Sequence, residues 1–336
     1  MAATMMHQRA QFEVRPSLMT GDSAEVYLHR TQRVLRTEGL NPVVVMEFSA
    51  MAAGTLCGVE EVQALLARVM SEGNREVWSV PEGAAIDQGE VCLTIRAPYS
   101  SFGLYETAIT GIMAQATGWA SAAKELVTAA GGVPVSCVGA HNVHPSVAAV
   151  MDYAAVVGGC QSGSTTLGGR LTGTQPISSV SGALLQIIGD PLRALQAFDR
   201  AMSADVPRVA YVDPRRDIAE QTAQLARLMR DKIAAVRLAR APGGRQVTAE
   251  TIAEVRRRLD ALGCQAVKII VSGDLTPDRI TGLLEQGAPV DALHDGSYVA
   301  RANPIPFRPN IRSIDDRSVE QEVEPTPPNP RLARVL

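Results

Sequence analysis

Residues 266–274, Ala-Val-Lys-Ile-Ile-Val-Ser-Gly-Asp, form the stretch that decides the fold. A continuous apolar run of this kind is typical of a parallel strand that is buried on both faces. It ends in Ser272, Gly273 and Asp274, and a helical stretch follows it. The piece therefore predicts one strand–helix unit with polar residues at the C-terminal end of the strand.

The same alternation of apolar run and helical stretch continues from about residue 131 to residue 303. The other runs are PVSCVGAHN (134–142), YAAVVGGCQSG (153–163), QPISSV (175–180), VPRVAYVDP (206–214), AAVRLAR (234–240) and VDALHDG (290–296). Helices must cross over between parallel strands. About six or seven such units in some 170 residues favour a closed, irregular (β/α) barrel over an open sheet.

Residues 1–130 have a different pattern, in which helical periodicity mixes with short β-rich pieces. Turn residues between the β-branched runs of 76–98 predict a compact antiparallel sheet, so we expect an N-terminal α/β domain with an open sheet. The tail is expected to contribute residues 304–320 to this sheet. Its Pro-rich end, 321–336, is expected to be extended or disordered.

Composition limits the possible partners and location. Hydrophobic residues make up 46% of the chain, and the formal charge of -3 gives no electrostatic case for nucleic acid or an anionic membrane. No signal-peptide core and no membrane-length apolar run is present, so we expect a cytoplasmic protein that acts on a small-molecule substrate. The five cysteines form no CxxC pair, which indicates reduced thiols.

In a barrel of this type, the reactive groups stand at the C-terminal ends of the strands. The candidate catalytic residues at these ends are imidazoles and carboxylates, which suit general acid–base chemistry or a divalent metal such as Mg²⁺. They are His141, Asp213, Asp274, His294 and Asp295. The three aspartates are the candidate metal ligands.

Five motifs carry a resemblance to a known family. They are YLHRTQRVL (27–35), LYETAITG (104–111), VGAHNVHP (138–145), VKIIVSGDL (267–275) and VDALHDGS (290–297). Their order from about residue 21 to residue 311 resembles the nicotinate phosphoribosyltransferases, which are type II phosphoribosyltransferases like the quinolinate enzyme. The resemblance implies a homodimer or higher homo-oligomer with shared active sites. It also implies the transfer of phosphoribose from 5-phosphoribosyl pyrophosphate with Mg²⁺.

The resemblance also implies roles for individual side chains. Candidates for the substrate site are Tyr27, Arg30, Tyr105, Glu106, Asn142, Ser178, Ser179, Arg237 and Arg240, together with two phosphate-binding turns at Ser272-Gly273 and Gly296-Ser297. The His144-Pro145 pair matches the family as a structural element.

The chain departs from the family pattern at several of these positions. His141 and Asn142 stand where basic residues would grip an anion. Gly182 occupies the place of the phosphorylatable histidine, so no ATP-coupled phosphohistidine is expected. Asp274 and Asp295 enter the two phosphate turns, where each would repel a phosphate by about 1 to 4 kcal/mol at 4 Å.

Three interpretations remain open. The chain is a divergent enzyme acting on a small aromatic acid or nucleotide-like ligand with changed chemistry, a genuine phosphoribosyltransferase for an aromatic acceptor, or a non-catalytic partner subunit. The sequence predicts that the first two respond to a ligand, and that the third requires a partner protein.

Overall fold

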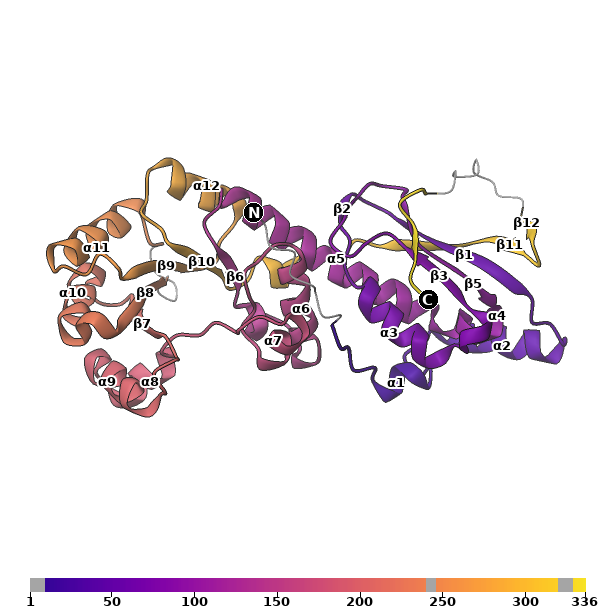
Figure 1. Ribbon diagram of the computed structural model, residues 1–336, viewed down its shortest axis with the longest axis horizontal. Coiled ribbons are helices and arrows are strands. Elements are labelled where there is room, and N and C mark those ends of the chain that lie inside the picture. The colour runs from indigo at the N-terminus through magenta and orange to yellow at the C-terminus, as the bar shows by residue number, and fades with distance from the viewer. Residues whose placement is uncertain (1–9, 240–245, 320–328) are drawn as a thin grey trace. The chain divides into compact units, whose positions relative to one another are not determined.

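The computed structural model describes residues 10–239, 246–319 and 329–336 (Figure 1). Its contacts divide the chain into two compact units, Met1–Ser121 with Ala302–Leu336, and Ala122–Arg301. The mixed α/β fold class is confirmed, because the first unit carries an antiparallel sheet and the second a parallel sheet with helices. Closure of the parallel sheet into a barrel stays a prediction. We describe each unit by itself.

The first unit is built on a six-stranded antiparallel sheet with the order β12-β11-β1-β5-β3-β13. The strands are β1 (Val43–Ala50), β3 (Glu76–Ser79), β5 (Val91–Pro98), β11 (Phe307–Ile314), β12 (Arg317–Ser318) and β13 (Ala333–Arg334). A small second sheet pairs β2 (Gly54–Thr55) with β4 (Ala85–Ile86). Burial alternates residue by residue along β1, so one face of the large sheet forms the core.

Helices α3 (Val59–Val69) and α5 (Glu106–Ala129) pack on that buried face. The other helices of the unit are α1 (Pro16–Met19), α2 (Val26–Thr37) and α4 (Tyr99–Phe102), with 3-10 turns η1 (Glu72–Asn74) and η2 (Gly103–Tyr105). Leu66 of α3 and Ile109 of α5 share a fully buried cluster with Phe48 of β1. A Cβ on Gly118 of α5 would lie 2.3 Å from the carbonyl oxygen of Asn303, so the glycine lets the returning chain pack directly on the helix.

The C-terminal tail completes the first sheet more fully than the sequence indicated. Strands β11 and β12 fall in the segment expected to join it. The end of the tail was expected to lack regular structure, yet β13 pairs with β3. Leu332, Val335 and Leu336 pack on the core, and Arg331 donates to Glu90 at 2.8 Å, which explains why this short segment is held. Residues 320–328 lie outside the described residues.

The second unit contains a five-stranded parallel sheet with the order β6-β10-β9-β8-β7. The strands are β6 (Val135–Cys137), β7 (Arg208–Val212), β8 (Ile233–Ala239), β9 (Lys268–Gly273) and β10 (Ala292–Asp295). The helices are α6 (Pro145–Val157), α7 (Thr166–Thr172), α8 (Gly182–Ile188), α9 (Pro191–Ala201), α10 (Ile218–Met229), α11 (Ala249–Ala261) and α12 (Pro277–Glu285). Short 3-10 turns are η3 (Gly139–Asn142), η4 (Arg230–Lys232) and η5 (Val299–Arg301).

Two of the seven apolar runs are not strands, which corrects the expected strand count. Residues 153–157 end helix α6, and residues 175–180 are irregular. Isolated backbone hydrogen bonds nevertheless link the two edges of the sheet through these segments. They are Gln161 N to Val135 O (2.7 Å), Cys137 N to Ser162 O (3.0 Å), Ile177 N to Gly163 O (3.0 Å) and Val180 N to Val209 O (3.0 Å). Pro176 has no N–H to donate, which prevents a regular ladder there.

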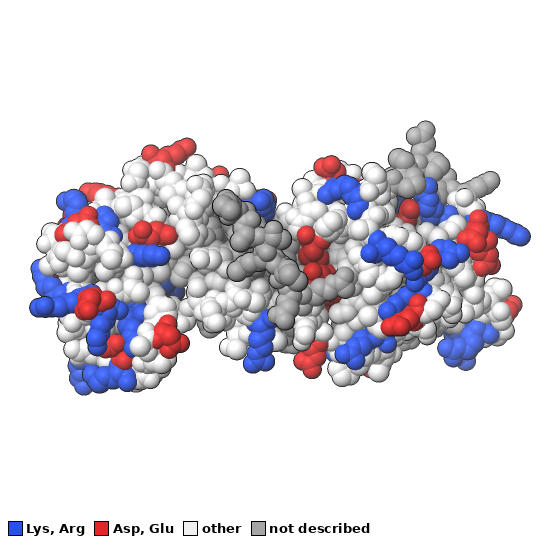
Figure 2. Space-filling model, in the orientation of Figure 1, with Lys and Arg blue, Asp and Glu red and all other residues white. Residues whose placement is uncertain are grey.

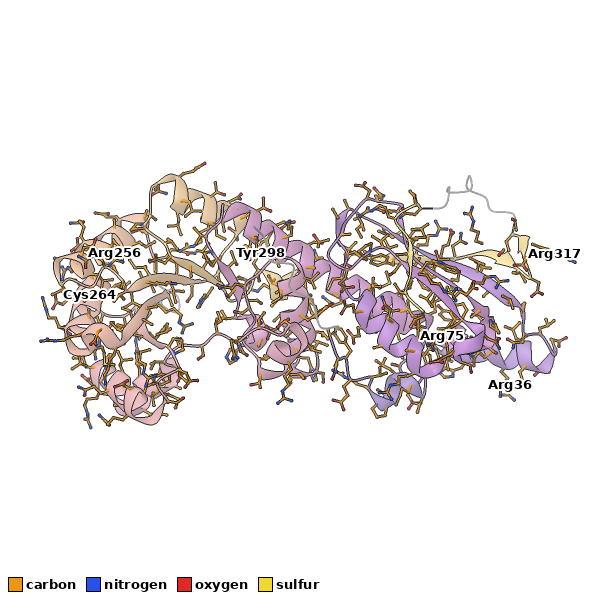
Figure 3. All side chains as sticks on the ribbon, viewed as in Figure 1. Arg36, Arg75, Arg256, Cys264, Tyr298 and Arg317 are labelled. Atoms are coloured by element: carbon orange, nitrogen blue, oxygen red, sulfur yellow. The ribbon has the colours of Figure 1, made fainter. Side chains whose placement is uncertain are left out.

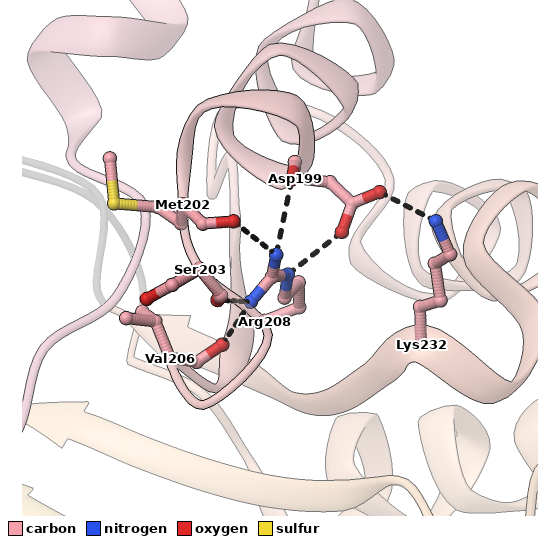
Figure 4. Close-up of polar contacts among 6 residues, drawn as sticks. All are labelled: Asp199, Met202, Ser203, Val206, Arg208 and Lys232. Carbon is pink, nitrogen blue, oxygen red and sulfur yellow. Dashed lines mark hydrogen bonds and ion pairs between the residues drawn. The ribbon is translucent and has the colours of Figure 1, made fainter.

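A buried arginine fixes the chain between α9 and β7 (Figure 4). Arg208 donates through Nε to Asp199 Oδ1 at 2.8 Å, and its other nitrogens donate to four backbone carbonyls. The carbonyls belong to Asp199, Met202, Ser203 and Val206. Lys232 donates to the second carboxylate oxygen of Asp199 at 2.9 Å. The cluster holds the first residue of β7 and thereby the strand that carries part of the candidate site.

The visible surface gives no indication of a single-sign field. On the face drawn in Figure 2, acidic and basic side chains are interspersed over both units. Among the described helices, none is long and apolar enough to cross a membrane. The expected absence of nucleic-acid partners stays a prediction.

Candidate active site at the parallel sheet

One face of the parallel sheet carries the candidate site. Side chains of successive strand residues point to opposite faces. Val236, Leu238 and Val271 are completely buried and share one face. Arg237 and Ser272 alternate with them and therefore point to the other face, where Arg237 is only half-buried.

Strand register arranges this second face in two layers. Partners across parallel strands at the same register lie on the same face, so neighbouring pairs define a layer. The deeper layer contains Tyr211, Arg237, Ile270 and Ala292, and the layer nearer the C-terminal ends contains Ala239, Ser272, His294 and Ser136. The deeper layer combines one cation and one aromatic ring with Ile270 and Ala292, whereas the outer layer contains three polar side chains and Ala239.

Arg237 is the cation of the deeper layer. Its guanidinium carbon lies 4.8 Å from the centroid of the Tyr211 ring. Its Nε is buried without a hydrogen-bond partner, and within the described ranges no carboxylate forms an ion pair with it. Burial lowers the pKa of Arg237, but an arginine keeps its charge in proteins. The site thus presents an uncompensated positive charge on an aromatic platform.

His294 lies one layer further out and is 6% exposed. Burial, followed by repulsion from Arg237, lowers its pKa to about 4. The imidazole is therefore neutral at physiological pH and offers one hydrogen-bond donor and one acceptor. It can orient a ligand, but it does not supply a second positive charge.

The backbone N–H groups of the turn after β10 donate hydrogen bonds to the carboxylate of Asp295. Asp295 is fully buried and accepts from the backbone N–H groups of Ser297 (3.1 Å), Tyr298 (2.9 Å) and Val299 (3.0 Å). Burial raises the pKa of Asp295, and these hydrogen bonds oppose the rise. Beside it, the Ser297 hydroxyl donates to Asp274 at 2.7 Å.

The carboxylate of Asp213, at the end of β7, also accepts its hydrogen bonds from groups of the protein itself. Arg215 holds both carboxylate oxygens, with Nε and Nη2 each at 2.9 Å, and these hydrogen bonds lower the pKa of Asp213. Throughout the described part of the chain, no three His, Cys, Asp or Glu side chains come together as a metal site. The expected ligand set of Asp213, Asp274 and Asp295 does not form there.

The two histidines of the run after β6 separate into different environments. His144 caps α6, where its Nδ1 accepts from Ser146 N at 3.1 Å, so its role is structural. His141 lies exposed in η3. The amide of Asn142 donates to the carbonyl of Gly296, which brings η3 against the turn after β10.

The segment before α8 approaches the same face from the β7 side. Ser178 and Ser179 precede Val180, which bonds to β7. A Cβ on Gly182 would lie 3.7 Å from Cε1 of Tyr211, so this position faces the aromatic platform. Arg240 lies outside the described residues.

The N-terminal candidates lie in the first unit and form contacts there. Tyr27 of α2 donates its hydroxyl to Glu106 at 3.1 Å. Burial and then Glu106 raise the pKa of Tyr27 to about 12. The Tyr105 hydroxyl donates to the Met19 carbonyl at 2.9 Å, and Arg30 is exposed.

Two residues of the site were missed from the sequence. Tyr211 and Ser136 lie within strands β7 and β6 and not at their C-terminal ends. Counting back by two residues from Asp213 would have placed Tyr211 on the same face of the sheet as the end of its strand. Ser136 also accepts a hydrogen bond from Ser162 at 3.3 Å. Tyr298, labelled in Figure 3, donates to Glu125 of α5 and anchors the turn after β10 from outside.

Two family models match consecutive parts of the chain. Residues 26–117 match the quinolinate phosphoribosyl transferase N-terminal domain, and residues 119–308 match its C-terminal domain. Together they cover both units described above.

Individual relatives agree with these models. The chain is 32% identical to the nicotinate-nucleotide pyrophosphorylase structure from Pyrococcus furiosus, with a TM-score of 0.83, and the match covers 94% of this chain and 81% of that one. It is 28% identical over 232 residues to nicotinate phosphoribosyltransferase pncB2 of Mycobacterium tuberculosis, which is 69% of this chain and 49% of the relative. The chain thus spans about half the length of the curated relatives it matches. Nicotinate-nucleotide pyrophosphorylase from Ehrlichia chaffeensis, at 12% identity and a TM-score of 0.67, covers 89% of this chain and all (100%) of its own, and shows the fold alone.

Proposed function

This chain belongs to the quinolinate phosphoribosyl transferase family, and from that premise we propose that it is a phosphoribosyltransferase for a small aromatic acid. The donor would be 5-phosphoribosyl pyrophosphate, and the products would be a mononucleotide and pyrophosphate. The names of the mycobacterial and Pyrococcus relatives support nicotinate as the first acceptor to test.

The observation that carries the proposal is the uncompensated Arg237 on the Tyr211 ring. A planar guanidinium matches a carboxylate in a two-point hydrogen bond, and the match is stronger where water is excluded. Tyr211 gives the acceptor ring an aromatic surface to pack on. One cation beside one ring suits an aromatic acceptor that carries a carboxylate.

The chemistry places few demands on acid–base groups. A pyridine nitrogen carries no proton, so it can form the bond to the anomeric carbon while the carbon–oxygen bond to pyrophosphate breaks, without any proton transfer. A neutral His294 is compatible with such a reaction, because its role would be to orient the ligand by hydrogen bonding. The residues of the outer layer need only position the reactants and exclude water.

Among the described side chains no three potential ligands converge, so we propose no metal site built from protein ligands alone. Mg²⁺ usually binds through substrate phosphates with few protein ligands. We therefore treat Mg²⁺ as part of the donor substrate. Gly182 has no side chain to phosphorylate, so ATP coupling through that position stays excluded in our proposal.

The proposed enzyme works as a homodimer with shared sites. Tyr27 is 51% exposed on α2 and Arg30 is exposed on the same helix, so both are available to a partner subunit. The hydrogen bond from Tyr27 to Glu106 would hold the Tyr27 side chain in position to contact the partner subunit. The alternatives of changed chemistry and of a non-catalytic subunit stay predictions.

The test is pyrophosphate release from the donor with MgCl₂ and a panel of pyridine monocarboxylates and dicarboxylates. We expect release only when a suitable acid is present. Arg237→Met should lower kcat/KM for the acid by about 100-fold, since truncating one partner of a buried charge pair costs about 2–5 kcal/mol. Arg227→Met, on the exposed face of α10, is the matched control. Equal loss in both variants, or no release with any acid, would contradict the proposal.

A further inference from the structure

We propose that the first unit carries a binding site for an adenine mononucleotide, between the C-terminal half of α2 and the start of α4. The site is a cavity of about 350 Å³. Its lining residues are Gln32, Leu35, Arg36, Leu40, Asn41, Tyr99 and Ser100. All of them belong to the first unit, whereas Arg237 and His294 belong to the second, so the inference does not depend on the proposed function.

Helix periodicity places three of the lining side chains together. Gln32, Leu35 and Arg36 are three and four residues apart on α2, so they share one face of the helix. The wall that they form combines an amide, an aliphatic group and a cation. Small-molecule sites usually have volumes of about 300–1,000 Å³ and combine apolar walls with a few polar groups, as this cavity does.

Two hydrogen bonds fix the polar side of the cavity. Gln32 Nε2 donates to the Ser100 carbonyl at 3.3 Å, and Ser100 N donates to Asn41 Oδ1 at 3.1 Å. Within the described ranges, Gln32 Oε1 and Asn41 Nδ2 have no protein partner. One acceptor and one donor are therefore left for a ligand, on two side chains that the backbone of Ser100 holds in place.

This acceptor and donor match one edge of an adenine ring. Adenine presents an exocyclic amino group, which donates, beside a ring nitrogen, which accepts, and Asn and Gln side chains pair with that edge. Gln32 Oε1 would accept from the amino group, and Asn41 Nδ2 would donate to the ring nitrogen. Hypoxanthine has an oxygen in place of the amino group and would set a second acceptor against Gln32 Oε1.

The apolar side of the cavity provides a surface for the base. Leu40 is 54% exposed, Leu35 is partly buried, and Tyr99 is buried at the base of the cavity wall. A Cβ on Gly103 would lie 2.5 Å from Cζ of Tyr99, so the tyrosine ring packs directly on this glycine. A planar purine would cover the exposed leucine and pack beside a ring that is already held in place.

Arg36 supplies a positive charge for the phosphate. Its side chain, labelled in Figure 3, is exposed in the last turn of α2. Among the residues that the structure describes, no carboxylate forms an ion pair with it. A guanidinium binds a phosphate through two parallel hydrogen bonds. One guanidinium suits one phosphate group, so the ligand is a mononucleotide.

The test is isothermal titration calorimetry on the full chain with adenosine monophosphate (AMP), inosine monophosphate (IMP) and adenosine. IMP should bind about tenfold or more weakly than AMP, because it leaves the acceptor on Gln32 facing another acceptor. Adenosine should bind about fivefold or more weakly, because Arg36 then has no phosphate to bind.

Three variants test the same contacts from the side of the protein. Asn41→Asp keeps the oxygen that accepts from Ser100 N but replaces the donor by an acceptor, so it should weaken AMP binding by about tenfold or more. Arg36→Gln should make AMP and adenosine bind equally well. Arg33→Gln removes the same charge from an exposed residue of α2 that does not line the cavity, and it should leave AMP binding unchanged.

The outcomes separate this site from the one at the parallel sheet. Equal binding of AMP and IMP, no AMP binding at millimolar concentration, or AMP binding that Asn41→Asp leaves unchanged would overturn the inference. Arg237→Met should bind AMP as the wild type does, and a loss of AMP binding in that variant would assign the nucleotide to the parallel sheet instead. Pyrophosphate release is measured separately, so its absence would overturn the proposed function and leave this inference in place.

Discussion

Replacing Arg237 by methionine should leave the stability of the protein nearly unchanged, whereas the same replacement at Arg208 should be severely destabilising. Both arginines lie on neighbouring parallel strands. Arg208 donates five hydrogen bonds to Asp199 and four backbone carbonyls. Arg237 has only the Tyr211 ring as a described partner, and its buried Nε has none. The comparison therefore separates a structural arginine from one available to a ligand.

The magnitudes follow from these partners. Arg237→Met loses a cation–π contact of about 0.5–2 kcal/mol. It also removes an unsatisfied buried donor, which relieves about 1–3 kcal/mol. The two effects oppose each other, so the net change should lie within about 1 kcal/mol of zero. Arg208→Met leaves several buried acceptors without a donor and should cost about 3–5 kcal/mol, the usual result of breaking a buried ion pair.

The assay is equilibrium unfolding in guanidinium chloride followed by far-ultraviolet circular dichroism. The midpoint concentration reports the change in stability where the slope of the transition is the same in both variants. A loss of about 3 kcal/mol or more in Arg237→Met would refute the reasoning. Arg237 would then be needed to hold the sheet together, and its availability to a carboxylate would lose its main support.

Two other predictions concern helix α5 and the outer layer of the site. Gly118→Ala should destabilise the first unit by about 1–3 kcal/mol, because its Cβ would lie 2.3 Å from the Asn303 carbonyl oxygen. In the control variant Gly111→Ala, on the same helix, the Cβ meets nothing within 4 Å, so this variant should be neutral or stabilised by up to about 1 kcal/mol. The melting temperatures of the two variants test this prediction. The pKa of His294 is lowered from 6.5 to about 4, so its contribution to stability is present above pH 6.5 and is lost as the pH falls toward 4. Wild type should therefore lose more stability than His294→Gln over that pH range, and parallel melting curves for the two proteins would contradict the assignment.

The sequence predicted the regular strand–helix units well because their signal is local. The run around Ile269 and Ile270 is a strand, and polar residues stand at its end as expected. The prediction of strands in segments 153–163 and 175–180 was wrong, because a buried apolar helix end and an irregular segment have the same composition as a buried strand. Only the backbone hydrogen bonds distinguish them.

The candidate site was less predictable because its properties depend on neighbours far along the chain. The sequence identified His294 and Arg237, but not that burial and Arg237 keep His294 neutral. It identified Asp295 as a carboxylate near a ligand, whereas the structure directs both oxygens to the backbone of its own turn. Tyr211 was missed because it lies inside a strand, where an aromatic side chain usually belongs to the core.

The most direct test of the central claim is mass spectrometry of a reaction containing the protein, 5-phosphoribosyl pyrophosphate, MgCl₂ and a pyridine carboxylate. The account predicts a product with the mass of the acid plus one ribose phosphate, formed in equal amount with pyrophosphate and formed about 100-fold more slowly by Arg237→Met at low concentrations of the acid. Pyrophosphate without a ribosylated acid, or product formation by Arg237→Met at the wild-type rate, would contradict it.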